Sequence, residues 1–264
     1  MKIAILGTGN LGYSIAIGIL SQENFKFKNL YLTKRETSSI DSLAKLPNVK
    51  ISTDNKKAVR FSDVIIIAVQ PKQLQGVLEE IKDYINPKRH TVISVVTGRE
   101  ISEIESVLGT DIAIVRSMPN TAISVGQSMT CMSGNKKGAE NIEYAKMIFN
   151  SLGKTMCIEE RLMQAATVIC ASGIAFWMRL IRATTQGAVQ LGFDAEEAQE
   201  LSMQTALGAA SLLIKSRNHP EEEIDKVTTP SGCTIQGLNE MEHQGLSSSL
   251  IKGLMASFDK INQI

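Results

Sequence analysis

The stretch Lys2-Ile3-Ala4-Ile5-Leu6-Gly7-Thr8-Gly9-Asn10-Leu11-Gly12 decides the predicted fold. A short apolar run enters a GxGxxG turn, and apolar residues then recur at helical spacing at Ile15, Ala16 and Ile19. Strand, glycine turn and helix in this order are typical of a dinucleotide-binding βα unit. The first glycine permits the tight turn, the second lets the backbone approach a pyrophosphate, and the third lets the helix pack on the strand. We therefore predict that a pyrophosphate is held by Gly7, Thr8, Gly9, Asn10, Leu11 and Gly12.

The N-terminal part alternates β-branched apolar runs with amphipathic stretches, which favours βαβ units and a mainly parallel sheet. After about residue 160 the strand signal stops and helical periodicity continues to the end. We predict an α/β Rossmann-type domain over residues 1–159 and an all-α domain over residues 160–264. The strands are expected at residues 2–6, 29–33, 64–69, 91–96, 112–117, 128–132 and 155–158.

Composition excludes several classes of protein. Lysine plus arginine (28) almost balances aspartate plus glutamate (27) over 264 residues, so the chain has no field that would gather nucleic acid or anionic lipid. The four cysteines form no CxxC pair, and the three histidines are scattered. We expect no metal, no disulfide framework and a reducing, cytoplasmic setting.

The helical region carries its own signals. Residues 162–178 have no charged side chain but are interrupted by polar residues, which favours a core or subunit-interface helix over a membrane span. That helix is expected from about residue 161 to 186, and we predict that it makes the protein an obligate homodimer, with further assembly left open. Asp194 and Glu197 predict a capping box at the start of the next helix, and Pro220 predicts the first turn of a short helix.

The residues at the end of the second predicted strand indicate which nucleotide the protein binds. NAD-specific folds usually place an acid there for the ribose 2′-hydroxyl, whereas this chain has Thr33, Lys34 and Arg35. A hydroxyl and two cations suit a 2′-phosphate, which favours NADPH, with NADH as the open alternative. The competing interpretation is that both cations are solvated loop charges and that Glu36 accepts the ribose.

A second candidate site lies in the C-terminal part, where residues 228–235 read Thr-Thr-Pro-Ser-Gly-Cys-Thr-Ile and lead into a helix. The unpaired N–H groups of a helix start suit an anion such as a substrate carboxylate. An ordinary loop with a helix cap explains the same pattern.

The chain resembles the pyrroline-5-carboxylate reductases, the family of the last enzyme of proline biosynthesis, nearly from end to end. The resemblance is carried by the glycine turn, Asn55, Ala68-Val69-Gln70-Pro71, Arg116 to Thr121 (RSMPNT, similar to RxMPNTP), Leu207 to Ala210, and Thr229 to Ile235 (similar to SPGGTT). It implies an NADPH-dependent oxidoreductase that reduces the C=N bond of 1-pyrroline-5-carboxylate to proline by hydride transfer. It also implies dimers joined through the C-terminal helices.

The resemblance further implies a role for each matching residue. Asn55 is placed on the adenosine side, and the substrate carboxylate meets the backbone of Ser231, Gly232, Cys233 and Thr234. The Thr234 hydroxyl is the catalytic group and reaches the ring nitrogen. The nicotinamide end is lined by Ala68, Val69, Gln70, Pro71, Thr97, Gly98, Met118, Pro119 and Asn120.

The chain departs from the family pattern at several positions. Gln70 replaces lysine, Ala122 and Ile174 replace proline, and Ser231 and Cys233 replace glycine and a threonine or alanine. Ser231 is the most serious change, because a side chain restricts the backbone of an anion-binding turn. Two other functions stay open. A β-hydroxyacid dehydrogenase would need a lysine between residues 161 and 192, where there is none, and a non-catalytic NADP(H)-binding sensor would need no hydroxyl loop.

Overall fold

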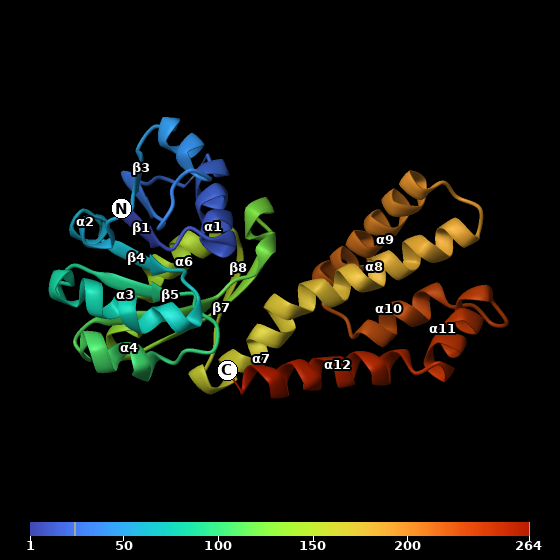
Figure 1. The fold of residues 1–264 in the computed structure, drawn as a ribbon. Coiled ribbons are helices and arrows are strands. Elements are labelled where there is room, and N and C mark those ends of the chain that lie inside the picture. The colour runs from blue at the N-terminus through green and yellow to red at the C-terminus, as the bar shows by residue number, and fades with distance from the viewer. Residues whose placement is uncertain (24, 264) are drawn as a thin grey trace. The chain divides into compact units, whose positions relative to one another are not determined.

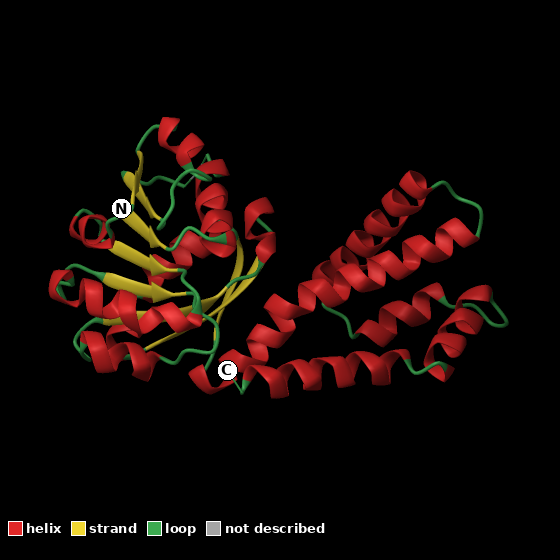
Figure 2. Ribbon diagram, viewed as in Figure 1, coloured by secondary structure: helices red, strands yellow, loops and turns green. Residues whose placement is uncertain are grey.

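A computed structural model describes residues 1–23 and 25–263 and divides the chain into two compact units. The first unit comprises residues 1–172 and the C-terminal residues from Phe258 on, and the second comprises Gly173–Ser257. The first unit is built on a sheet and the second is helical (Figures 1 and 2). The helical stretch that begins at Glu160 crosses from the first unit into the second, at Ser172. The domain boundary at residue 160 therefore stays a prediction.

The sheet of the first unit has the strand order β3-β2-β1-β4-β5-β6-β7-β8. All neighbouring strands are parallel except β6 and β7, which are antiparallel. The strands are β1 (Lys2–Leu6), β2 (Asn29–Thr33), β3 (Val49–Ser52), β4 (Val64–Ile67), β5 (Thr91–Ser94), β6 (Ala113–Met118), β7 (Ser128–Gly134) and β8 (Gly153–Cys157). The predicted mainly parallel sheet is confirmed, and β3 is the strand that the sequence analysis missed.

Helices cover both faces of this sheet (Figure 2). Ile3 and Ile5 of β1 pack into the cluster that contains α1, whereas Ala4 and Leu6 pack into the cluster that contains α3. Strands buried on both faces explain the nearly continuous apolar runs. The helices of this unit are α1 (Asn10–Ser21), α2 (Asn55–Arg60), α3 (Leu74–Ile81), α4 (Ile101–Leu108), α5 (Lys136–Glu140), α6 (Ile142–Asn150) and α7 (Met163–Ala166). Its 3₁₀ segments are Asp41–Lys45, Pro71–Gln73, Lys82–Tyr84, Thr121–Val125 and Glu160–Leu162.

The second unit begins after a π-helical turn, Thr167–Ser172, that continues α7 into α8. Its helices are α8 (Gly173–Gln190), α9 (Ala195–Ser216), α10 (Pro220–Val227), α11 (Cys233–His243) and α12 (Leu246–Ile261), the last of which enters the first unit. The Asp194 and Glu197 capping box is present, and Pro220 occupies the first turn of α10. Gly245 adopts a left-handed conformation (φ 80°) between α11 and α12, which separates the two helices.

The continuous helical stretch Glu160–Gln190 has the length and apolar composition of a membrane span. Only 17% of its most apolar window is buried within this chain. The helix predicted from residue 161 is therefore present, but a single chain does not form a core around it.

Candidate functional site

The glycine turn has the geometry that its sequence predicts. Gly7 adopts φ +92°, and a Cβ there would lie 2.6 Å from Val69 Cγ1. A Cβ on Gly12 would lie 2.4 Å from the Gly7 carbonyl oxygen, so only glycine lets α1 pack this closely on the turn. A Cβ on Gly9 would meet no atom of the chain within 4 Å. Gly9 therefore leaves free space beside the backbone at the start of α1, which is where a pyrophosphate approaches such a helix.

Hydrogen bonds join this turn to the end of β2. The carbonyl oxygen of Thr33 accepts from the Gly7 N–H at 3.1 Å, the Thr8 N–H at 2.8 Å and the Thr8 hydroxyl at 3.1 Å. Thr33 is only 2% exposed. These bonds hold Thr33, predicted to contact the 2′-phosphate, next to the glycine turn, predicted to hold the pyrophosphate.

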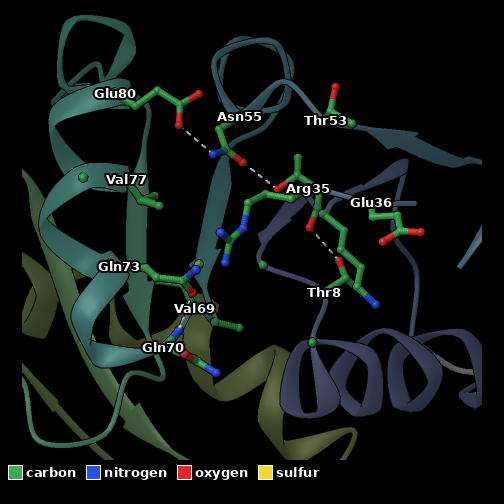
Figure 3. Close-up of a pocket in the computed structure, with 16 residues that line it drawn as sticks. Thr8, Arg35, Glu36, Thr53, Asn55, Val69, Gln70, Gln73, Val77 and Glu80 are labelled. Carbon is green, nitrogen blue, oxygen red and sulfur yellow. Dashed lines mark hydrogen bonds between the residues drawn. The ribbon is translucent and has the colours of Figure 1, made fainter. Parts of the chain in front are cut away.

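A cavity of about 610 Å³ opens at the carboxyl ends of β1, β2 and β4 (Figure 3). The order of the strands reverses between β1 and β4, and parallel α/β sheets bind ligands at such a switch point. Ten residues predicted to bind the cofactor line the cavity, namely Gly7, Thr8, Gly9, Thr33, Lys34, Arg35, Asn55, Ala68, Val69 and Gln70.

The other predicted cofactor residues do not line this cavity. Asn10, Leu11 and Gly12 form the first turn of α1, and Pro71 starts a 3₁₀ turn. Thr97 and Gly98 follow β5, and Met118 is the buried end of β6. Asn120 contacts the π-helical turn Thr167–Ser172, because its Nδ2 donates to the Cys170 carbonyl oxygen at 2.9 Å. The lining residues that the sequence analysis missed are Thr53, Gln73, Gly76, Val77 and Glu80.

Both cations and one acid lie at the rim of the cavity. Lys34 Nζ donates to Ser39 Oγ at 2.6 Å, and the Glu36 carboxylate accepts from Ser38 Oγ at 3.2 Å. Among the described residues, no ion pair involves Lys34, Arg35 or Glu36. The Arg35 side chain extends toward α3, whereas the Glu36 carboxylate turns the other way (Figure 3). The arrangement leaves a guanidinium free to meet an anion.

The candidate substrate loop belongs to the second unit. Ser231 adopts a left-handed conformation (φ 57°). Glycine, which the family has at this position, adopts that conformation freely, whereas it is unfavourable for serine. Gly232 caps α11 with no side-chain hydrogen bond, and a Cβ there would lie 2.4 Å from Thr229 Oγ1. Cys233 and Thr234 are the first two residues of the helix. The first turn of α11 thus has backbone donors without a side-chain cap, as an anion site requires.

Two family models match the chain. One describes pyrroline-5-carboxylate reductase dimerisation and matches residues 160–264, and the other describes a coenzyme F420-dependent NADP oxidoreductase and matches residues 2–98. Among curated relatives, "Pyrroline-5-carboxylate reductase 2" of Dictyostelium discoideum is 44% identical over 98% of this chain and 91% of its own length. "Pyrroline-5-carboxylate reductase 1" of the same organism is 47% identical over 98% of this chain, which spans about half (49%) of that relative.

A crystal structure of Plasmodium falciparum pyrroline carboxylate reductase with NADP bound has the same fold. It matches with a TM-score of 0.89 and 27% identity over 100% of this chain and 97% of the other. The fold and the cavity define a dinucleotide-binding protein of the doubly wound α/β class, extended by a helical C-terminal part. Within that class, the chain belongs to the pyrroline-5-carboxylate reductase family.

Proposed function

We propose that this protein reduces the C=N bond of 1-pyrroline-5-carboxylate to proline with NADPH as the hydride donor. The observation that carries the proposal is the full-length relationship to pyrroline-5-carboxylate reductases together with a cavity at the switch point of the sheet. The helical part between residues 161 and 192 holds no lysine, which argues against a β-hydroxyacid dehydrogenase mechanism.

The cavity fits a phosphorylated dinucleotide. Gly9 leaves room for a pyrophosphate, and Lys34 and Arg35 supply positive charge at the far end of β2. The related Plasmodium enzyme has NADP bound, which supports NADPH here. Six residues that do not line the cavity remain assigned to the nicotinamide end as part of this proposal, namely Pro71, Thr97, Gly98, Met118, Pro119 and Asn120.

The proposed reaction requires little acid or base catalysis from the protein. When bound, NADPH supplies the hydride from its nicotinamide ring. The backbone N–H groups of Cys233 and Thr234 bind the substrate carboxylate. Ser231 and Gly232 shape the turn that presents them, since the Gly232 N–H donates to the Thr229 carbonyl oxygen at 2.9 Å. The Thr234 hydroxyl orients the ring nitrogen, which needs no strong acid where the imine arrives protonated. Orientation of this kind lowers the barrier by removing the entropic cost of aligning the two reactants.

We further infer a homodimer in a cytoplasmic setting. The family model for dimerisation matches the helical part, and the helix Glu160–Gln190 is mostly exposed in a single chain. The free cysteines Cys131, Cys157, Cys170 and Cys233 agree with a reducing compartment.

The direct test mixes the purified protein with NADPH and a panel of cyclic imine acids, and follows the loss of reduced cofactor by absorbance. Turnover of 1-pyrroline-5-carboxylate is expected, and a matched panel of keto acids should give none. NADPH binding without turnover of any imine acid would favour the non-catalytic sensor, whereas turnover of keto acids alone would favour the dehydrogenase alternative.

The cofactor preference has its own test, in which Lys34 and Arg35 are both replaced by alanine. The double variant should weaken NADPH binding far more than NADH binding, because only NADPH carries the 2′-phosphate that the two cations are proposed to meet. Equal losses for the two cofactors would refute the assignment.

A further inference from the structure

Three side chains from three elements form a hydrogen-bonded chain along the cavity wall. Thr33 at the end of β2 donates from Oγ1 to Asn55 Oδ1 at 2.6 Å. Asn55 at the start of α2 donates from Nδ2 to Glu80 Oε2 of α3 at 2.8 Å. Figure 3 shows the Asn55 amide facing the Glu80 carboxylate, and all three residues line the cavity.

The carboxylate decides which way the Asn55 amide faces. An ionised carboxylate only accepts hydrogen bonds, so Glu80 selects the NH₂ group of the amide. The amide oxygen is thereby turned toward Thr33, whose hydroxyl must donate to it. An amide NH₂ group has two N–H donors, and Glu80 takes one of them. The other is left for a group within the cavity.

Charge alone does not explain an acid at this position. Glu80 lines the same cavity as Lys34 and Arg35, and a carboxylate there opposes the binding of a phosphate. Among the described residues, Glu80 forms no ion pair, whereas its neighbour Glu79 pairs with Lys82 at 2.6 Å. The contact with Asn55 is thus the interaction that Glu80 makes in the cavity wall.

We infer that Glu80 is a positioning residue that locks the Asn55 amide so that its second N–H donates to an oxygen of the adenosine half of the cofactor. The inference rests on the proposed function, since Asn55 has such an oxygen to meet only when the cavity holds a dinucleotide. Because Glu80 acts through Asn55, its effect is expected on cofactor affinity and not on the chemical step.

The experiment compares Glu80→Ala with Glu80→Gln and with Glu79→Ala. Dissociation constants are measured for NADPH by fluorescence and for adenosine 2′,5′-bisphosphate by calorimetry, and kcat and KM are measured for the imine reaction. Glu80→Ala should weaken both ligands about three- to tenfold, the size of one ordinary hydrogen bond, and should raise the KM for NADPH with kcat unchanged. Glu80→Gln should bind within about twofold of the wild type, because its amide oxygen also accepts. Glu79→Ala, altered at the adjacent surface position, should behave as the wild type.

Glu80→Asp keeps the charge but shortens the side chain by one methylene group. It should weaken both ligands as alanine does, and it provides the same comparison where the alanine variant fails to fold. Unchanged affinity in Glu80→Ala and Glu80→Asp would overturn the inference, and so would a Glu80→Gln variant as weak as alanine. A wild type that binds both ligands but reduces no imine acid would refute the proposed function and leave these binding comparisons intact.

Discussion

Thr234 and Cys233 are neighbours at the start of α11, and single substitutions separate the hydroxyl from the thiol. Thr234→Ala keeps the backbone N–H but removes the group proposed to orient the imine nitrogen. A hydrogen bond to a charged group contributes about 1.5 to 3 kcal/mol, so kcat/KM should fall roughly ten- to a hundredfold while NADPH affinity scarcely changes. Thr234→Ser should keep much of the activity, and Cys233→Ala should be tolerated. Steady-state kinetics would contradict this mechanism if Cys233→Ala abolished turnover while Thr234→Ala kept it.

A second residue, His90, links stability to pH. His90 is buried, and its Nδ1 accepts from the Asn86 backbone N–H at 3.0 Å. Burial, and then the positive charge of Arg89, lower the pKa of His90 below its ordinary value of 6.5. As the pH falls, His90 therefore binds a proton at a higher pH in the unfolded chain than in the folded one. The stabilisation by neutral His90 is complete above pH 6.5 and is lost as the pH falls below that value toward the lower pKa of the folded state.

His90→Asn keeps an acceptor and removes the titration. Urea unfolding at about pH 7 and about pH 5 should show a smaller loss of unfolding free energy in this variant than in the wild type. His243→Asn, at an exposed position of α11, is the control and should keep the wild-type difference. Identical losses in the wild type and His90→Asn would show that His90 does not link folding to protons.

At the scale of elements, two glycines of one motif have separable roles. Gly12→Ala places a Cβ 2.4 Å from the Gly7 carbonyl oxygen, so α1 must move away from the glycine turn, at a cost of about 1 to 3 kcal/mol in unfolding free energy. Gly9→Ala adds a Cβ that meets nothing in the chain, so stability should change by less than about 1 kcal/mol. The same methyl group fills the space proposed for the pyrophosphate, and NADPH affinity should drop. Unfolding without nucleotide and NADPH titration measure the two effects, and the opposite pattern would refute this division of roles.

At the scale of the whole molecule, the second unit has too little core of its own. The buried positions of α8 and α9 are Gly173, Thr185, Ala198 and Ser202, which are small. Large apolar side chains stay exposed in the single chain, including Trp177 (65%), Leu207 (60%) and Ile214 (63%). An exposed apolar surface of this extent is typical of a subunit interface. In a two-fold symmetric interface, each substitution occurs once in each subunit and so changes the interface at two places.

If Trp177 lies in the interface of the inferred dimer, Trp177→Glu should shift the protein to a monomer at micromolar concentration, or remove its fold, because the two-fold axis buries the charge twice. Sedimentation velocity measures the change. Tyr144→Glu on α6 alters an exposed aromatic residue of the first unit (47%) and should leave the dimer intact. A well-folded wild-type monomer would contradict the inferred assembly.

Local patterns by themselves determined most of the fold. Buried parallel strands are apolar throughout, helix starts carry their caps within three or four residues, and the glycine turn combines both signals, so β1, α1, the Asp194 capping box and Pro220 were all predictable. β3 was missed because the alternation of apolar and polar residues in Val-Lys-Ile-Ser extends over only four residues, which is too short to stand out.

The tertiary structure alone decided the far wall of the cavity and the backbone of the candidate substrate loop. Gln73, Val77 and Glu80 reach the cavity because α3, in the crossover from β4 to β5, packs on the sheet face that carries Ala4 and Leu6 of β1. No local sequence pattern predicts that contact. The left-handed conformation of Ser231 follows from the path between α10 and α11 and opposes the preference of serine itself. Sequence patterns encode what each segment does over a few residues, whereas a site is assembled from contacts between segments tens of residues apart, which only the folded chain brings together.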